Sequence, residues 1–132
     1  MNKLLTALFL ACPVLLFADV EKISPAEAAR LVTAGKAVLI DVRESSEWAE
    51  TGVAAPAMLL AKSDFDAGQV GKWKDFLAQA GDTEIILYCR SGHRAGIVGA
   101  ALEKSGHKVA NAGGFNDWQA AGLPTRKVDE KR

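Results

Sequence analysis

The sequence predicts an α/β domain with a mainly parallel central sheet of about five short strands, flanked by helices on both faces. Three observations lead to this fold class. Helical patterns alternate along the chain with apolar runs of strand length. These runs do not alternate with polar residues, which is typical of parallel strands that are covered on both faces. No dipeptide such as Asn-Gly, the usual hairpin signal, separates neighbouring strands.

The first helix and the first strand have clear limits in the sequence. Ser24 begins the run Ser-Pro-Ala-Glu, a capping box with proline at the first helical position. A helix is therefore expected over about Pro25–Thr33, and Gly35 ends it. Ala37–Ile40 is an apolar run of strand length, and Asp41–Glu44 is expected to form the turn at its carboxyl end.

The middle of the chain carries weaker signals. Ser45 or Ser46 is expected to cap a short helix, and Ala57–Leu60 is a weaker strand candidate. We expect an irregular lead-in over 62–69 and then a helix over roughly Val70–Ala80. Four apolar residues in this helix have the spacing i, i+3, i+4, i+7 of a single helix face: Trp73, Phe76, Leu77 and Ala80.

The last third of the chain repeats the alternation of strand and helix. The apolar run Glu84–Tyr88 predicts a buried strand, and a helix is expected over Arg94–Ser105. A short strand at 108–110 and a helical stretch over 115–121 follow. The connection between these last two elements, Asn111–Gly114, is expected to be a turn.

The sequence predicts one domain behind an export signal. Residues 1–18 contain a basic residue, an apolar stretch and a small residue, Ala18, at a cleavage position, so we expect a signal peptide. The apolar stretch is shorter than the roughly 20 residues that cross a bilayer, so no stable membrane insertion is expected after cleavage. Residues 19–132 then form the single domain, and its charged tail over 126–132 is expected to fray.

Composition and charge exclude several classes of function. The chain has 16 basic and 16 acidic residues, so its overall charge does not indicate a nucleic-acid partner. It has two histidines and two cysteines, and one of the cysteines, Cys12, lies in the expected signal peptide. This leaves too few ligands for a zinc site, and no glycine-rich phosphate-binding motif is present. We therefore expect no metal and no cofactor.

The residues with the clearest chemistry surround Cys89. This cysteine ends an apolar strand and is followed by a loop of polar and cationic residues, after which a helical pattern begins: Arg90, Ser91, Gly92, His93 and Arg94. Backbone N–H groups in such a loop, the start of a helix and cationic side chains all favour negative charge. We therefore expect Cys89 to be largely a thiolate at neutral pH and interpret it as a nucleophile.

Three predicted turns are expected to lie at one edge of the sheet, because each follows a parallel strand. Ligands of such sheets bind outside the carboxyl ends of the strands. One of these turns contains Asp41 and Arg43, for which we favour structural roles, as a turn acceptor and as an ion-pair partner, over direct roles in the site. Glu47 lies in the first turn of a helix, where the helix dipole accounts for an acidic residue.

Three segments of the sequence resemble the rhodanese homology domain. They are Ile40–Glu44 with the Glu-Trp pair that follows, Tyr88–Ala95, and Asn111–Pro124. The resemblance covers nearly all of the chain after the signal peptide. With that signal peptide, the chain is most similar to small single-domain thiosulfate sulfurtransferases of the bacterial periplasm. The resemblance therefore implies a rhodanese-like fold and a periplasmic location.

What the resemblance implies is a persulfide cycle. The Cys89 thiolate attacks the outer sulfur of a small anionic donor such as thiosulfate, and sulfite leaves. The bound sulfur then passes to a thiophilic acceptor, either cyanide or a thiol, with a protein thiol as a further candidate. By position, the N–H groups of Arg90 to Arg94 cradle the persulfide, Arg94 closes the loop and Arg90 faces anionic donors. His93 is interpreted as a loop residue that tunes donor access.

Loop length separates this chemistry from that of related phosphatases. Cys89 and Arg94 enclose four residues, whereas phosphatases that use a cysteine and an arginine enclose five. The loop is therefore expected to fit a sulfur rather than a phosphate.

One segment departs from the family pattern, because 52–57 reads Gly-Val-Ala-Ala-Pro-Ala in place of Gly-His-Ile-x-Gly-Ala. We expect this change to affect local geometry more than activity.

The sequence leaves open an alternative from another class of function. A domain of this type can serve as a non-enzymatic module that docks a partner or carries a persulfide without turnover. A sulfurtransferase and a carrier both gain sulfur at Cys89, whereas a docking module does not. Uptake of sulfur from thiosulfate therefore separates the docking module from the other two.

Overall fold

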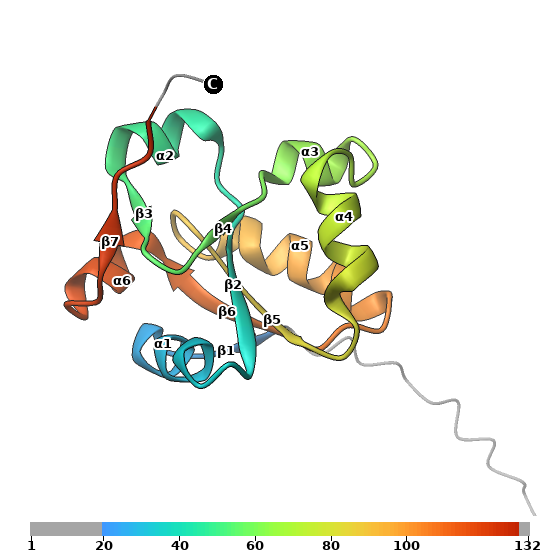
Figure 1. Ribbon diagram of the computed structural model, residues 1–132, viewed down its shortest axis with the longest axis horizontal. Helices are drawn as coiled ribbons and strands as arrows, with labels where there is room; N and C mark the ends of the chain where they lie inside the picture. The colour runs from blue at the N-terminus through green and yellow to red at the C-terminus, as the bar shows by residue number, and fades with distance from the viewer. Residues whose placement is uncertain (1–19, 130–132) are drawn as a thin grey trace, which may run out of the picture.

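A five-stranded parallel sheet forms the centre of the computed structural model, which describes residues 20–129 (Figure 1). The expected signal peptide lies outside these residues. The strand order is β1-β6-β5-β2-β4, and every neighbouring pair is parallel, as predicted. The strands of this sheet are β1 (Glu21–Lys22), β2 (Ala37–Asp41), β4 (Met58–Leu59), β5 (Glu84–Cys89) and β6 (Val109–Gly114). A separate antiparallel pair joins β3 (Val53–Ala54) to β7 (Thr125–Arg126).

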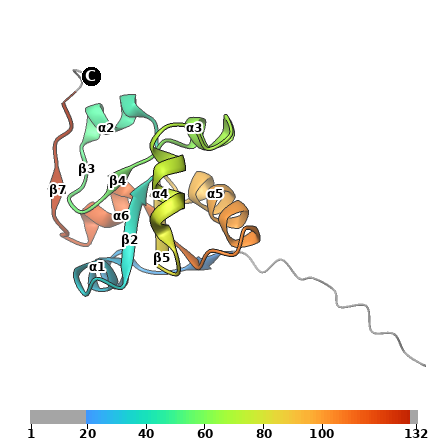
Figure 2. The same cartoon turned by 45° about the vertical axis from the view of Figure 1, so that its right-hand side comes forward.

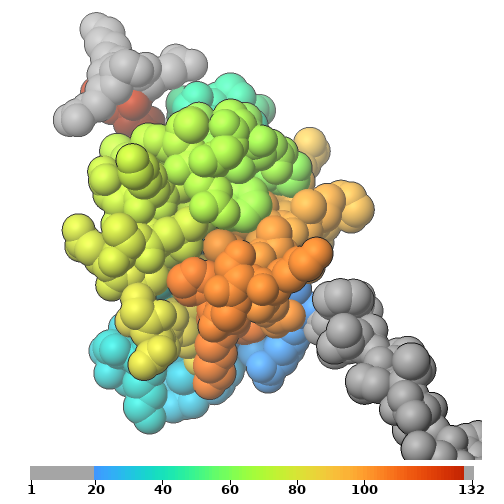
Figure 3. Space-filling view, turned by 90° about the vertical axis from the view of Figure 1, so that its right-hand side faces the viewer, coloured from blue at the N-terminus to red at the C-terminus, as the bar shows by residue number. Residues whose placement is uncertain are grey.

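Helices cover both faces of the sheet, as predicted (Figures 1 and 2). One face carries α1 (Pro25–Thr33) and α6 (Phe115–Ala120). The other face carries three helices, which lie side by side in Figure 3: α3 (Lys62–Asp66), α4 (Lys72–Ala80) and α5 (His93–Lys104). The remaining helix, α2 (Ser45–Thr51), follows the carboxyl end of β2. Among residues 20–129, no helix has the length and apolar character needed to cross a membrane.

The central strand β5 divides the apolar interior into two cores. Ile85, Leu87 and Cys89 belong to the core under α5, whereas Ile86 and Tyr88 belong to the core under α1 and α6. This alternation follows from the two-residue period of a strand. Burying a side chain such as isoleucine or leucine stabilises the fold by about 1.5–3 kcal/mol. Cys89 therefore ends β5 with its side chain in the α5 core.

The first helix begins and ends where the sequence predicts. The Ser24 Oγ accepts a hydrogen bond from the Glu27 N–H at 3.1 Å, and proline occupies the first turn. The helix spans Pro25–Thr33, and Gly35 follows with a positive φ of 72°. These limits were predictable because the capping residues make local hydrogen bonds that do not depend on the rest of the fold.

Two expectations for the middle of the chain were wrong. The short helix is capped by Glu44 rather than by Ser45 or Ser46, since the Glu47 carboxylate accepts the Glu44 N–H at 2.9 Å. The segment expected to be irregular contains α3, which the ring of Trp73 supports. That ring meets the Phe65 ring edge-on at 5.0 Å between centroids, and its Nε1 donates to the Ala61 carbonyl at 2.8 Å. A helix this short depends on tertiary contacts, so its sequence shows no periodic pattern.

Two expectations for the carboxyl-terminal part were also wrong. Asn111–Gly114 continues strand β6 instead of forming a turn, and Cys89 pairs with Gly114 across a register shift. Arg126, expected at the start of a frayed tail, lies in β7. Its guanidinium donates to the carbonyls of Ala55 and Ala57 at 3.1 and 2.8 Å. Pairing with β3 therefore orders a polar segment that has no strand signal of its own.

Candidate active site

Cys89 lies where β5 meets the loop that leads into α5. The Gly92 N–H donates to the Cys89 Sγ at 3.0 Å. Gly92 can turn this amide toward the sulfur because it adopts a left-handed conformation with φ of 95°, which a glycine accommodates without strain. Helix α5 begins at the next residue, His93, so its N-terminus also lies at the loop. Both features stabilise negative charge on the sulfur.

The sulfur is closed off from solvent in this conformation. Cys89 is 0% exposed and packs in the α5 core, whereas Arg90, Ser91 and His93 in the loop above it are exposed. The sequence indicates apolar neighbours only on the strand side of Cys89, but the folded chain surrounds the residue. A donor larger than water can reach the sulfur only after a shift of the loop or of the side chains around it.

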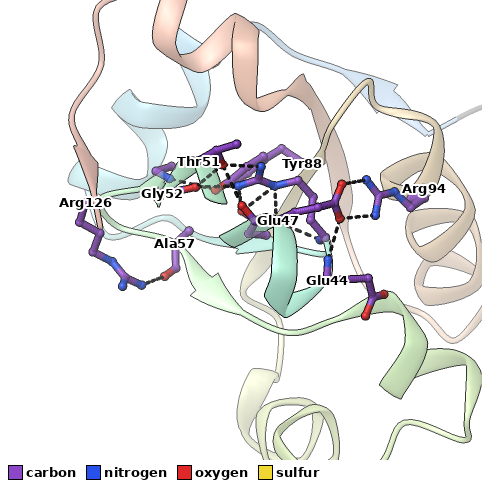
Figure 4. Close-up of polar contacts among 11 residues, drawn as sticks. Glu44, Glu47, Thr51, Gly52, Ala57, Tyr88, Arg94 and Arg126 are labelled. Carbon is purple, nitrogen blue, oxygen red and sulfur yellow. Dashed lines mark hydrogen bonds and ion pairs between the residues drawn. The ribbon is translucent and has the colours of Figure 1, made fainter. Parts of the chain in front are cut away.

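An ion pair fixes the far end of the loop to α2 (Figure 4). The Arg94 guanidinium binds the Glu47 carboxylate through two parallel hydrogen bonds, each 2.7 Å long. Hydrogen bonding to Arg94 lowers the pKa of Glu47 to about 2, although partial burial opposes this shift. Glu47 is therefore a partner of the cysteine loop, a role that the helix dipole invoked from the sequence does not include. The two residues are 47 positions apart, a pairing that no local pattern signals.

We expect Glu47→Gln to lower the free energy of unfolding at pH 7 by about 1–3 kcal/mol, because one charge-assisted, bidentate contact is lost. The pKa of Glu47 is lowered by folding, so its contribution is present above the ordinary carboxyl range near pH 4.5. That contribution is lost as pH falls toward about 2. Urea unfolding of both proteins at several pH values should show a difference at pH 7 that shrinks in acid.

A matched control for this prediction is Glu27→Gln. Glu27 also binds an arginine, Arg30, but their side chains are 42% and 60% exposed. Solvent screens such a pair, so its loss should change stability much less. A Glu47→Gln protein as stable as the wild type at pH 7 would contradict the role assigned to the Arg94 contact.

The loop is held from the opposite side by β6. The Asn111 Nδ2 donates to the Gly92 carbonyl at 2.9 Å, and its Oδ1 accepts the Gly113 N–H at 2.9 Å. Gly114 lies so close to Arg90 that a Cβ at this position would overlap the Arg90 carbonyl oxygen. These contacts orient the peptide groups on both sides of the sulfur. The one signal in the sequence was a polar residue, Asn111, between two alanines of a buried strand.

Asp41 and Arg43 form a buried ion pair beside the loop. Their closest contact, from Nη2 to Oδ2, is 2.8 Å, and Arg43 is only 2% exposed. The same guanidinium donates to the Thr51 hydroxyl and to the Gly52 carbonyl, each at 2.9 Å, and lies 4.5 Å from the centre of the Phe115 ring. With its donors used in this way, Arg43 joins β2 to the end of α2. The geometry favours the structural roles preferred from the sequence.

Residues of the cysteine loop line two cavities. The larger, of about 550 Å³, includes Ser91, Gly92 and His93 in its lining. The smaller, of about 180 Å³, is here called the Arg90 cavity. Its lining comes from the turn after β2, from α2, from the loop and from the start of α6: Arg43, Glu47, Glu50, Thr51, Arg90, Phe115 and Asn116. Because it includes Arg90 and the partner of Arg94, this cavity adjoins both ends of the loop.

The residues brought together here are those of the predicted sheet edge. The loop from Arg90 to Arg94 contacts α2 through Glu47 and β6 through Asn111 and Gly114. Arg43, which is hydrogen-bonded to Asp41, lines the Arg90 cavity. Within residues 20–129, no group of three or more His, Cys, Asp or Glu residues could hold a metal ion.

Fold and site together define a parallel α/β domain with a cysteine beneath an anion-stabilising loop at the end of its central strand. The chain belongs to the rhodanese family, since the family model described as "Rhodanese-like domain" matches residues 24–121. The resemblance seen in the sequence is thereby confirmed. Among curated proteins, none was found to match this chain.

Several solved structures are similar to this chain. A protein of unknown function from Rhodopseudomonas palustris, described as a possible tyrosine phosphatase, is 21% identical with a TM-score of 0.68, over 81% of this chain and 85% of that one. The polysulfide-sulfur transferase homodimer of Wolinella succinogenes is 24% identical with a TM-score of 0.64, over 86% and 83%. These two similarities show that the fold is shared.

A third similar structure is the thiosulfate sulfurtransferase of Pseudomonas aeruginosa. It is 25% identical to this chain with a TM-score of 0.64 over 82% of this chain, which spans only 19% of that protein. Together with the family, this likeness supports a sulfurtransferase-type or persulfide-related role.

Proposed function

We propose that this protein is an exported, cofactor-free sulfurtransferase that carries sulfane sulfur from thiosulfate, or a similar small anion, on Cys89. The acceptor is cyanide or a thiol. The observation that carries the proposal is the hydrogen bond from the Gly92 N–H to the Cys89 Sγ beneath a cationic loop. A sulfur held in this way is stabilised as an anion, both as a thiolate and as a persulfide.

The proposed reaction consists of two displacements at sulfur. The Cys89 thiolate forms a bond to the outer sulfur of thiosulfate, the S–S bond of thiosulfate breaks, and sulfite leaves with the electron pair. The acceptor then bonds to the outer sulfur of the persulfide, and Cys89 leaves as a thiolate. No oxidant or reductant is consumed. Dividing the transfer into two steps on one nucleophile predicts ping-pong kinetics.

Each loop residue has a part in this proposal. Arg90 is exposed, directly follows Cys89 and lines the Arg90 cavity, where it can attract an anionic donor. Arg94 is engaged with Glu47 and so sets the position of the loop rather than binding the donor. Ser91 and His93 are exposed above the sulfur and line the larger cavity, through which they can influence access.

A second candidate function is the non-enzymatic module, which docks a partner or carries a persulfide. One observation favours it: Cys89 is 0% exposed, so the resting conformation gives a donor no direct access to the sulfur. In the sulfurtransferase proposal, the exposed loop opens when a donor binds. In the docking alternative it stays closed.

The test is an assay of the purified protein with thiosulfate and cyanide. We expect thiocyanate to form, with parallel double-reciprocal plots when the concentrations of both substrates are varied, because sulfite leaves before cyanide reacts. The absence of thiocyanate above the uncatalysed background would contradict the proposed enzyme. Intersecting plots would contradict a free persulfide intermediate.

A further inference from the structure

The Arg90 cavity is lined by four charged side chains, of which two are already paired. Arg43 binds the buried Asp41, and Glu47 binds Arg94. Glu50 and Arg90 remain. Within residues 20–129 neither of these makes an ion pair, with the other or with any third residue. The cavity therefore offers one uncommitted negative charge and one uncommitted positive charge.

The positions of Glu50 and Arg90 connect both charges with the sulfur carrier. Glu50 follows Glu47 by three residues on α2, so both side chains lie on the helix face that meets the cysteine loop. Arg90 directly follows Cys89 in the chain. Both side chains are exposed, yet they line the same cavity without pairing across it. A ligand lying between them would meet opposite charges on its two sides.

This charge pattern discriminates between ligands. A dianion such as the proposed donor can bind Arg90 alone, and a thiol with a single charge can likewise bind only one of the two residues. A molecule with both a carboxylate and an ammonium group can bind both. The volume of about 180 Å³ suits a small free molecule, and a cysteine within a protein chain lacks both charges.

We propose that the sulfur acceptor at this site is a free amino-acid thiol, such as cysteine, whose carboxylate binds Arg90 and whose ammonium group binds Glu50. The inference rests on the proposed function, since it names the acceptor class for the Cys89 persulfide. The acceptor thiolate forms a bond to the outer persulfide sulfur, the bond from that sulfur to Cys89 breaks, and Cys89 is released as a thiolate. The product is the persulfide of the amino acid, and any proton on the outer sulfur moves with it.

The experiment measures the discharge step alone. The purified protein is loaded with thiosulfate, freed of excess donor and mixed with one of four thiols: cysteine, cysteamine, 3-mercaptopropionate or 2-mercaptoethanol. Cysteine carries both charges, cysteamine only the ammonium group, 3-mercaptopropionate only the carboxylate, and 2-mercaptoethanol neither charge. Loss of the extra sulfur is followed by intact mass. Each variant is compared with the wild type on the same thiol, which removes differences in the reactivity of the thiols themselves.

We expect Glu50→Gln to slow discharge by cysteine and by cysteamine about three- to tenfold, and not to slow the other two thiols. Arg90→Gln should slow cysteine and 3-mercaptopropionate without slowing cysteamine. The matched control is Glu103→Gln, an exposed acidic residue near the other end of α5, which should change none of the four rates.

The outcomes separate this inference from the proposed function. If the wild type gains no sulfur from thiosulfate, the proposed function fails and the inference fails with it. If the protein is loaded and discharged but Glu50→Gln affects all four thiols equally, or none of them, the amino-acid thiol is rejected and the sulfurtransferase stands.

Discussion

Replacing Cys89 with serine is expected to abolish thiocyanate formation, with a loss of at least about a thousandfold down to the uncatalysed rate. In the proposed reaction the sulfur of Cys89 is both the nucleophile and the carrier, and a serine hydroxyl can neither be ionised in the same way nor form a persulfide. The remainder of the site stays in place in this variant, because the Gly92 N–H can donate to the serine oxygen as it does to the sulfur. The measurement is the thiosulfate and cyanide assay with both proteins side by side.

The control for Cys89→Ser is its thermal unfolding. The residue packs in the α5 core, so the variant must be shown to unfold cooperatively at a temperature close to that of the wild type. A folded Cys89→Ser protein that still produces thiocyanate at the wild-type rate would place the chemistry elsewhere in the chain.

Replacing Gly114 with alanine is expected to reduce turnover by about a hundredfold, the scale of effect that follows from moving reacting groups by about 1 Å. The added Cβ would overlap the Arg90 carbonyl oxygen and lie 3.0 Å from the Arg90 carbonyl carbon. Both contacts are with backbone, so the loop itself has to move. Gly114 has an ordinary φ of −108°, so the effect is steric and not conformational. Overpacking of this kind also destabilises a fold by about 1–3 kcal/mol.

The matched control for Gly114→Ala is Gly96→Ala. A Cβ at Gly96 would meet its nearest neighbour, the Asn111 Nδ2, at an ordinary 3.7 Å. Gly96 lies inside α5, where alanine is favoured over glycine by about 0.5–1 kcal/mol. This variant should keep wild-type turnover and gain stability. Equal turnover in the two variants would show that the contact between β6 and the loop does not position the site.

The parts of the fold that the sequence predicts are those specified by local interactions. The limits of α1 follow from hydrogen bonds at its capping box. The parallel sheet follows from apolar runs that are buried on both faces, as in β5. Segments such as α3 and β7 were missed because they are ordered by distant partners, the ring of Trp73 and the strand β3. The predicted strand at 108–110 was shorter than β6 because the two glycines of β6 resemble a turn.

The candidate site also has features that the sequence predicts and features that it does not. The loop from Cys89 to Arg94 is contiguous, so the candidate nucleophile and the N–H donors around it can be proposed from the sequence. The contacts that hold the loop come from other elements: Glu47 from α2, and Asn111 and Gly114 from β6. The complete burial of Cys89 also results from packing across the sheet, and the polar residues after it gave no sign of this. The residues of the loop were therefore identifiable from the chain, whereas the contacts that position the loop and the burial of its sulfur were not.

The intact mass of the purified protein after incubation with thiosulfate and removal of the donor tests the central claim, that Cys89 accepts sulfane sulfur, most directly. We predict a gain of one sulfur atom that is absent in Cys89→Ser and is removed by cyanide. A gain without thiocyanate turnover would identify a persulfide carrier. An unchanged mass in the folded wild-type protein would contradict the account and leave a docking module whose buried sulfur takes no part in chemistry.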